Sequence, residues 1–357
     1  MKTIGIVGGG QLGQMMIDAA NELGISAIVL DPDSVCPCSK NALEVVVGNY
    51  DDFSKLEAIV KKVDVLTYEF ENVDAEAISK LEGKYNIPQG SFILSISQNR
   101  IKEKDFAVKA GFNTAQYKKV SSNEELYAAL NNIGYPCILK TVTGGYDGKG
   151  QFLFNSEKDL IDIDREYILE EKIDFDYEVS CIASRSVNNE IVVFPLFKND
   201  HVKGILNRTK FLRNDKFQKE VEKIMIDYMN MMDYRGTLCV ELFIKGDEII
   251  FNEMAPRPHN SGHMTIEGCS ASQYKNHILG ILGLPLEKVE IIHDVQMVNI
   301  LGEDILKEEE MKKEKNVIIH NYGKKEVRPR RKMGHATFVD ASEEEINRFI
   351  DKYKKEY

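Results

Sequence analysis

A glycine-rich segment flanked by lysines is the strongest chemical signal in the sequence. The expected strand Cys137–Thr141 carries Lys140, and GGYDGKGQ follows at 144–151 before a strand resumes at Phe152. Glycines let backbone N–H groups converge on a phosphate without obstruction by Cβ atoms, and the two lysines supply positive charge. Because the segment lies between strands, it differs from a P-loop, which leads into a helix. We interpret it as a flexible lid over a triphosphate; an ordinary glycine-rich hairpin is the alternative.

Two glutamates form the next candidate site. Apolar runs on either side of residues 245–248 predict a β-hairpin, in which Glu241 and Glu253 lie opposite or nearly opposite each other. With regular alternation, Phe243 and Phe251 share their face. Like charges across a ladder, among aromatic rings, repel each other and are poorly solvated. A divalent cation removes this conflict, and oxygen ligands beside a phosphate suit Mg²⁺. The alternative places one exposed glutamate on each face.

Polar side chains follow directly after this hairpin. The segment MAPRPHNSGH at 254–263 holds Arg257, His259 and His263 in a loop stiffened by two prolines. Neither histidine has the partners that a zinc site needs, so contact with a substrate is the better interpretation.

A basic run lies near the end of the chain. Residues 324–332 contain six basic residues and one acidic residue, in a chain whose formal net charge is −11. Such a run is often only a solvated surface, and nucleic-acid contact is a functional alternative. No aromatic residues for base stacking accompany it, which favours a small phosphorylated substrate. Arginine can hold a phosphate through two parallel hydrogen bonds, and this favours Arg331 as the contact.

A separate glycine pattern opens the chain. Gly8, Gly10 and Gly13 follow a short apolar strand and precede a helix, and Asp31 ends the next strand. This spacing fits the fingerprint of dinucleotide-binding domains. An anion-facing or structural turn needs the same glycines, so the spacing alone leaves both alternatives open.

Composition limits the class of protein. The 357 residues are 43% hydrophobic and 29% charged, enough for roughly two to three packed domains. The acidic balance disfavours non-specific nucleic-acid binding. We expect no membrane span and no signal peptide, because no apolar run is long enough and no cleavage site follows the start. The six cysteines are expected to be reduced, structural thiols in a cytoplasmic protein.

Alternating strands and helices must position these sites. Residues 1–98 begin with the strand Thr3–Val7 and predict a doubly wound α/β domain. The expected elements after it are a polar helix from Arg100, a mostly strand-like stretch at 151–255 with one helix at 215–232, a helix at 271–282 and a strand-rich tail from Val295.

Four motifs together resemble the ATP-grasp enzymes, and within them the N5-carboxyaminoimidazole ribonucleotide synthetases of bacterial and fungal purine biosynthesis. The motifs are GGGQLG at 8–13, GGYDGKGQ at 144–151, NEMAPRPHNSGH at 252–263 and RKMGH at 331–335. The resemblance implies a mixed α/β and α+β architecture, the ATP-grasp fold. Its expected parts are a Rossmann-like pre-ATP-grasp domain at 1–98 that binds no NAD, a two-lobed ATP-grasp domain at 99–290 and a small β-rich C-terminal domain at 291–357.

The resemblance also implies roles for individual residues. Contacts to ATP are implied for Arg100, Lys140, Gly145, Tyr146, Asp147, Gly148, Lys149, Gly150, Gln151, Glu170, Glu171, Lys172, Ile173, Glu178, His201, Asn252 and Glu253. The implied Mg²⁺ ligands are Glu241 and Glu253. Contacts to the aminoimidazole ribonucleotide are implied for Tyr146, Asp147, Lys149, Arg257, His259, Lys324 and Arg331. The catalytic candidates are Asp147, which would orient or deprotonate the amine, Lys149 and Arg257.

Three positions depart from the family pattern. Lys149 stands where some relatives carry arginine, which keeps the charge but loses the planar fork of the guanidinium. Arg330 stands where a glycine is often found, and the adenine hinge at 170–173 matches loosely.

The implied reaction starts with bicarbonate, which attacks the γ-phosphate of MgATP to give carboxyphosphate and ADP. Carboxyphosphate, or CO₂ released from it, then carboxylates the exocyclic amine of 5-aminoimidazole ribonucleotide. The implied partners are ATP, Mg²⁺, bicarbonate and this ribonucleotide, with a homodimer and no nucleic acid or membrane. Three alternatives stay open: a different ATP-grasp ligase, a non-catalytic nucleotide-binding protein, and a dehydrogenase if the chain binds NAD(H).

Overall fold

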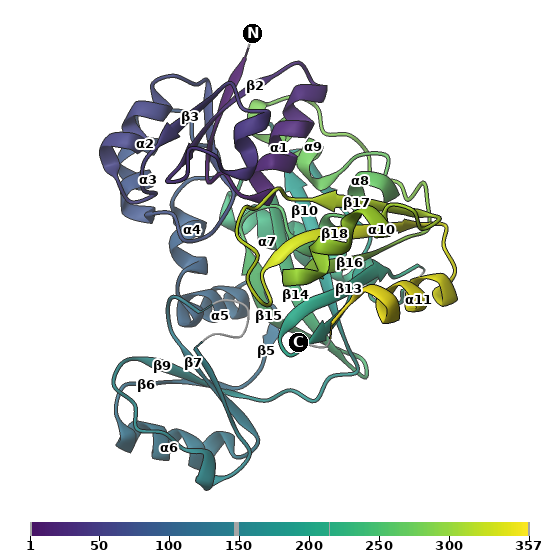
Figure 1. The fold of residues 1–357 in the computed structure, drawn as a ribbon. Coiled ribbons are helices and arrows are strands. Elements are labelled where there is room, and N and C mark those ends of the chain that lie inside the picture. The colour runs from purple at the N-terminus through teal and green to yellow at the C-terminus, as the bar shows by residue number, and fades with distance from the viewer. Residues whose placement is uncertain (1, 146–149, 214, 356–357) are drawn as a thin grey trace.

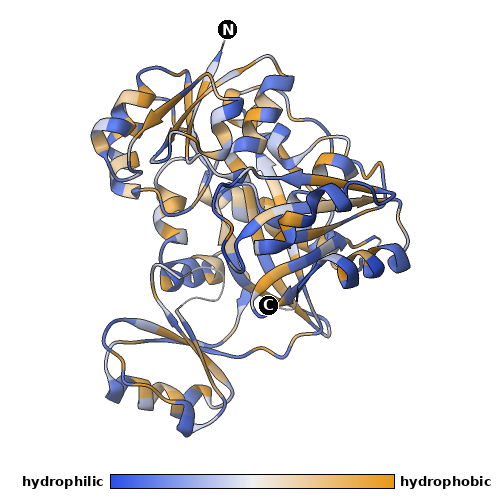
Figure 2. Ribbon diagram, in the orientation of Figure 1, coloured by the Kyte–Doolittle hydropathy of each residue, from blue (hydrophilic) through white to orange (hydrophobic). Residues whose placement is uncertain are grey.

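The computed structural model describes residues 2–145, 150–213 and 215–355. Its N-terminal part is a four-stranded parallel sheet in the order β3-β2-β1-β4 (Figure 1). The elements are β1 (Thr3–Val7), α1 (Gln11–Glu22), β2 (Ser26–Asp31), β3 (Glu44–Val47), α2 (Phe53–Val60), β4 (Val65–Tyr68) and α3 (Ala75–Glu82). Separate apolar clusters cover the two faces, and the inner strands β1, β2 and β4 are mostly hydrophobic (Figure 2). The side chains of Asp52 and Asp74 accept hydrogen bonds from the first N–H groups of α2 and α3 and fix where these helices begin.

Two helices lead from this domain to a small lobe. They are α4 (Phe92–Ser97) and α5 (Arg100–Lys109). The lobe has its own antiparallel sheet, in the order β6-β9-β7-β8. Its elements are β6 (Tyr117–Val120), α6 (Asn123–Ile133), β7 (Cys137–Thr141), β8 (Gln151–Phe154) and β9 (Tyr167–Glu171). In Figure 1 the lobe projects away from the rest of the chain.

A ten-stranded sheet forms the largest part of the molecule. Its path is β17-β18-β16-β13-β12-β10-β14-β15-β5, and β11 pairs with β10 beside this path. The strands are β5 (Asn113–Thr114), β10 (Tyr177–Arg185), β11 (Ile191–Val193), β12 (Phe197–Val202), β13 (Ile205–Phe211), β14 (Gly236–Lys245), β15 (Glu248–Ala255), β16 (Val295–Leu301), β17 (Val317–Asn321) and β18 (Lys332–Val339). The main core cluster lies between this sheet and α7 (Gln218–Met232). A second helix, α9 (Gln273–Leu282), packs against β14 and also against α1.

This sheet continues across residue 290. β13 and β16 pair antiparallel, with Arg208 opposite Val298. The expected C-terminal domain therefore extends the sheet of the ATP-grasp domain, and its division at residue 290 stays a prediction from the sequence.

The expected helices agree with the structure apart from their ends. The helix predicted at 215–232 starts at Gln218, and the one predicted at 271–282 starts at Gln273. The expected strand-rich tail also contains helices: α10 (Glu308–Met311) and α11 (Glu343–Tyr353).

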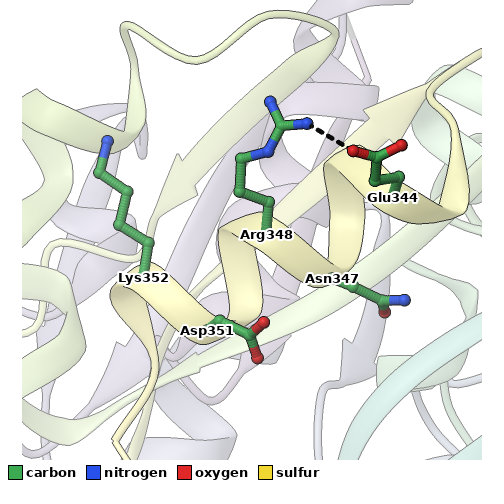
Figure 3. Close-up of a pocket in the computed structure, with 5 residues that line it drawn as sticks. All are labelled: Glu344, Asn347, Arg348, Asp351 and Lys352. Carbon is green, nitrogen blue, oxygen red and sulfur yellow. Dashed lines mark hydrogen bonds and ion pairs between the residues drawn. The ribbon is translucent and has the colours of Figure 1, made fainter.

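The helix α11 has a clear local cause. Ser342 and Glu345 form a reciprocal capping box at its start, and Ile346, Phe349 and Tyr353 are buried. Its outer face is polar. Figure 3 shows Glu344, Asn347, Arg348, Asp351 and Lys352 around a surface hollow on this helix. These side chains belong to the surface of one helix, and none of them is a candidate site residue.

The structure also describes the cysteines and the lengths of the helices. All six cysteines are free and buried, as expected for structural thiols. Among the described residues, no helix is both long enough and apolar enough to cross a membrane.

Candidate active site

Glu241 on β14 and Glu253 on β15 lie directly opposite each other in the antiparallel pair. The register slips between Glu241 and Leu242, so that Leu242 already faces Phe251. Asn252 is the extra residue of this bulge. The pairing confirms that the two glutamates face each other, and the bulge changes which side chains lie beside them.

The bulge separates the two aromatic rings expected beside the glutamates. Phe251 pairs with Leu242, and both lie in the core under α7. Phe243 lies on the other face, where its ring stacks on Phe175 at 4.4 Å between centroids. The prediction that Phe243 and Phe251 share a face is therefore wrong, because one extra residue in a strand inverts the alternation beyond it.

Carboxylates crowd together around Glu241. Burial, and then the charges of Glu178 and Glu253, raise the pKa of Glu241 well above its usual range. Burial followed by the charge of Glu253 raises the pKa of Glu178 to about 8. Glu178, His201 and Glu241 each offer a ligand atom within 4.8 Å of the others. The Nε2 atom of His259 lies 3.3 Å from Oε1 of Glu241.

These residues fit a hard divalent cation. Oε1 of Glu178 is buried and makes no hydrogen bond to any residue that the structure describes, although His201 Nδ1 lies 3.3 Å away. Buried acceptors without a donor and neighbouring carboxylates are both stabilised by a metal ion. The donor set is rich in oxygen, which matches Mg²⁺ better than Zn²⁺.

The helix α5 covers the open edge of β15. Because β5 pairs with β15 only at Ile250 and Phe251, the backbone beyond Phe251 has no described strand on the side away from β14. Arg100 Nη1 lies 3.2 Å from Glu253 Oε2, and Glu103 Oε1 accepts the N–H of Met254 at 2.6 Å. The Nζ atom of Lys104 lies 3.5 Å from the carbonyl oxygen of Asn252. One face of α5 therefore holds the segment that carries Glu253.

The same face of α5 reaches the small lobe. Lys140 on β7 donates to Oε2 of Glu170 on β9 at 2.9 Å, and Lys104 Nζ lies 3.4 Å from the same oxygen. Burial opposes the charge on Glu170, but the ammonium groups of Lys140 and Lys104 outweigh it and lower the pKa of Glu170. Lys140 is thus held by a carboxylate beside the glycine-rich segment.

The other expected hinge residues follow Glu170 at the end of β9. Glu171 donates its N–H to the carbonyl of Gln116, and Lys172 donates its N–H to the carbonyl of Pro136. Lys172 is exposed, and Ile173 is half-buried. The role of residues 170–173 as the adenine hinge stays a prediction from the resemblance.

The glycine-rich segment lies between two paired strands, as predicted. Lys140 pairs with Gln151, and Thr141 donates its N–H to the carbonyl of Gly150 at 2.9 Å. Gly150 has a φ of +73°, and a Cβ atom there would meet Thr141 Oγ1 at 2.7 Å. The expected contacts Tyr146, Asp147, Gly148 and Lys149 lie outside the described residues.

Arg257 and His259 approach the carboxylates from the loop after β15. Arg257 Nε donates to Oε2 of Glu71, in the N-terminal domain, at 2.5 Å. His259 shares a hydrogen bond of 2.8 Å with Ser261 Oγ, and burial, followed by the charge of Arg257, lowers its pKa well below the usual range. His259 therefore acts as a neutral hydrogen-bonding group.

The basic run makes hydrogen bonds within itself. Lys324 donates to the carbonyl of Lys332 at 2.8 Å, and its ammonium lies 5.5 Å from the ring centre of Tyr322. Arg331 donates to the carbonyl of Glu326 at 2.8 Å. Arg330 has a φ of +63°, a left-handed conformation that explains why glycine suits this position.

The domains found by comparison match these parts. The pre-ATP-grasp domain of ribonucleotide synthetases matches residues 1–98, the ATP-grasp domain matches 105–274, and the C-terminal domain of phosphoribosylaminoimidazole carboxylase matches 296–348. The N5-carboxyaminoimidazole ribonucleotide synthase of Staphylococcus haemolyticus is 41% identical over 359 residues, covering 97% of this chain and 95% of the relative. The chain belongs to the N5-carboxyaminoimidazole ribonucleotide synthase family. It is an ATP-grasp ligase with the expected mixed α/β fold.

Solved structures of this synthase family have the same fold. The Staphylococcus aureus synthetase complexed with ADP has a TM-score of 0.94 at 38% identity, covering 99% of this chain and 97% of that one. The Aspergillus clavatus synthase, in complex with ADP and 5-aminoimidazole ribonucleotide, has a TM-score of 0.91 at 29% identity, with 99% of both chains covered.

The resemblance to this synthase family implies that the N-terminal glycine turn binds no dinucleotide. Glu69, directly after β4, explains why. Its two carboxylate oxygens accept the N–H groups of Gly10 at 2.6 Å and Gly13 at 2.5 Å. Asp31 accepts the N–H of Gly9 at 2.8 Å. The donors that would bind a pyrophosphate are therefore occupied by the protein's own carboxylates.

Several residues around the site were not singled out by the sequence patterns of this synthase. Glu69, Glu71, Glu103 and Lys104 are acidic or basic residues without a motif of their own. One signal was available for two of them: α5 is a mostly polar helix, and Glu103 and Lys104 are charged residues among the three that it buries. Buried charges on a helix require partners, and this requirement points to a site.

Proposed function

We propose that this enzyme uses ATP and bicarbonate to carboxylate 5-aminoimidazole ribonucleotide, releasing ADP and phosphate, in de novo purine biosynthesis. The observation that carries the proposal is the opposed pair Glu241 and Glu253, with Arg100 at 3.2 Å from the second carboxylate and Lys140 in the adjoining lobe. Such a set suits the stabilisation of charge on transferring phosphoryl oxygens.

Glu241 and Glu253 are the residues that would hold Mg²⁺. When bound, Mg²⁺ would neutralise charge on the β- and γ-phosphates. Arg100 and Lys140 add positive charge that stays in place when the nucleotide leaves, and Gly145, Gly150 and Gln151 belong to the loop expected to cover the phosphates. Glu178 and His201 would contact the nucleotide beside Glu241, and Asn252 adjoins Glu253.

The ribonucleotide would lie between the N-terminal domain and the loop that carries Arg257. Bicarbonate oxygen attacks the γ-phosphorus and ADP leaves. The amine nitrogen then bonds to the carboxyl carbon of carboxyphosphate and displaces phosphate, or it bonds to CO₂ after carboxyphosphate has broken down to CO₂ and phosphate; in both cases the amine loses a proton. Arg257, fixed by Glu71, and the neutral His259 supply fixed donors beside this centre. Lys324 and Arg331 would contact the substrate phosphate. Asp147 would orient or deprotonate the amine, with Tyr146 and Lys149 beside it, as the resemblance implies.

The test is ADP release with ATP, Mg²⁺ and bicarbonate, with and without 5-aminoimidazole ribonucleotide. We expect strong stimulation by the ribonucleotide that disappears when bicarbonate is removed. ATP hydrolysis that is indifferent to the ribonucleotide would contradict the assigned substrate. Stimulation by formate or an amino acid, with no response to bicarbonate, would favour a different ATP-grasp ligase.

We also infer a homodimer in the cytoplasm, as the resemblance implies. Sedimentation velocity at micromolar concentration tests the dimer, for which a single species at the monomer mass would be the contrary result.

A further inference from the structure

Two buried ammonium groups share one carboxylate oxygen beside the expected phosphate site. Oε2 of Glu170 lies 2.9 Å from Lys140 Nζ and 3.4 Å from Lys104 Nζ. The side chains of Lys140, Glu170 and Lys104 are respectively 9%, 5% and 3% exposed. The other oxygen, Oε1, is buried and has no hydrogen-bond partner in the described part of the chain. The two lysines are therefore the close counter-charges of Glu170.

The three residues come from two parts of the molecule. Lys140 and Glu170 lie on neighbouring strands of the small lobe, β7 and β9, whereas Lys104 lies on α5. Lys104 also lies 3.5 Å from the carbonyl oxygen of Asn252, the residue before Glu253. Lys104 thus joins the small lobe to the strand that carries the carboxylate pair.

The arrangement creates a competition when a polyphosphate binds. Lys140 is expected to contact ATP, so phosphate oxygens and the Glu170 carboxylate compete for its ammonium group. A buried carboxylate that loses its partner is strongly destabilising, because its charge is neither solvated nor paired. With Lys104 in place, Glu170 keeps one ammonium partner while Lys140 turns to the phosphate.

We propose that Lys104 is a positioning residue that keeps Glu170 neutralised and so allows Lys140 to exchange this carboxylate for a phosphate of ATP. The proposal rests on the proposed function in one respect, that Lys140 contacts the nucleotide, and it gives the side chain of Glu170 the role of holding Lys140 in place of the implied contact with ATP. Lys104 itself touches neither substrate nor metal in this scheme.

A double-mutant cycle on Lys104 and Glu170 tests the exchange. The probe is the non-hydrolysable ATP analogue AMP-PNP with Mg²⁺, and the measurement is its Kd by isothermal titration calorimetry. We expect Lys104→Met to weaken binding by about tenfold, because Glu170 then holds Lys140 alone. We expect Glu170→Gln to tighten binding by a few-fold, since the competing carboxylate is gone.

The decisive variant is the double mutant. If Lys104 acts through Glu170, Lys104→Met changes the Kd by less than about twofold in the Glu170→Gln background. Equal losses in both backgrounds would overturn the proposal, because they would assign Lys104 a contact or a folding role independent of Glu170. If the single variant Glu170→Gln bound AMP-PNP more weakly than the wild type, that result would overturn the proposal as well.

Controls separate the exchange from loss of structure. Lys102→Met removes an exposed lysine from the same helix and should leave the Kd unchanged. Lys104→Arg, which keeps the charge, should restore most of the affinity. If Lys104→Met does not fold, Lys104→Gln, which keeps a donor for Asn252, takes its place in the cycle. Failure of the wild-type protein to bind AMP-PNP would instead contradict the proposed function.

Discussion

The carboxylate of Glu69 and the N–H of Gly10 are joined by a hydrogen bond of 2.6 Å at the start of α1. This is the position where a dinucleotide-binding turn presents its N–H groups to a pyrophosphate. An acidic side chain from the neighbouring strand β4 satisfies the same donors from within the protein, so the glycines serve close packing. A Cβ atom at Gly10 would meet Glu69 Oε1 at 2.6 Å.

This relationship predicts no binding of NAD(H). Titration with NADH, followed by its fluorescence, should show no saturation up to millimolar concentrations, because the N–H donors are occupied. Saturable binding at micromolar NADH would contradict the role given to Glu69.

Replacement of Glu69 by alanine should reduce stability. Two N–H groups at the start of α1 would lose their acceptor, and an unsatisfied buried donor costs about 1–3 kcal/mol. Urea unfolding gives the difference in the free energy of unfolding. Glu76→Ala, which removes an exposed carboxylate near the start of α3, is the matched control and should change stability far less.

Replacement of Glu253 by glutamine should abolish ATP turnover while the protein stays folded. The amide keeps the size of the side chain but removes the charge that would hold Mg²⁺, and we expect a loss of about 100-fold or more in kcat. ADP release measures the effect, and circular dichroism verifies the fold. Asp247→Asn, at the exposed turn of the same hairpin, is the control. Normal turnover by Glu253→Gln would remove Glu253 from the metal site.

His277 predicts a loss of stability in acid. It accepts the N–H of Thr237 and contacts Thr67 Oγ1 at 2.8 Å, and burial lowers its pKa to about 3. In the unfolded chain this histidine has an ordinary pKa of about 6.5, so between about pH 6.5 and pH 3 it binds a proton in the unfolded state and not in the folded state. The stabilisation is complete above pH 6.5 and is lost as the pH falls toward 3, by about 1.4 kcal/mol per pH unit.

The measurement is the free energy of unfolding of wild type and His277→Gln between pH 7 and pH 4. The variant should be less stable at pH 7 and should show a shallower pH dependence by one proton. Equal slopes for wild type and His277→Gln would contradict the assignment.

Arg330 predicts a difference between two small substitutions. Its φ of +63° strains any residue with a Cβ atom. Its side chain makes an exposed hydrogen bond, from Nη2 to the carbonyl of Lys203 at 2.8 Å. Arg330→Gly and Arg330→Ala both lose this hydrogen bond, but only glycine removes the strain. We expect the glycine variant to be more stable than the alanine variant by about 1 kcal/mol in thermal unfolding. Equal stability would show that the left-handed backbone carries no strain at this position.

The sequence predicted those parts of the fold and site that depend on local patterns. The hairpin that opposes Glu241 to Glu253 follows from a short turn between two apolar runs, and the strand–loop–strand placement of residues 144–151 follows from the glycines. The helix α11 was missed although its Ser342-x-x-Glu345 start is a local signal for a capping box.

The missing parts depend on contacts between distant segments. Regular alternation cannot predict the bulge at Asn252, which lies where α5 bonds the backbone of β15. Nor can spacing show that Glu69 occupies the glycine turn or that Lys104 reaches Glu170. Each of these pairs is brought together only by the packing of whole domains.

The continuity of the large sheet decides which parts of the enzyme can move separately. Turning residues 295–339 away from the preceding part would break the strand pairing of β13 with β16. The small lobe has a sheet of its own, so it can rotate without breaking the pairing of any strand. The N-terminal domain also has a sheet of its own, so strand pairing restrains neither it nor the small lobe, whereas the pairing of β13 with β16 makes the C-terminal strands one unit with the ATP-grasp sheet.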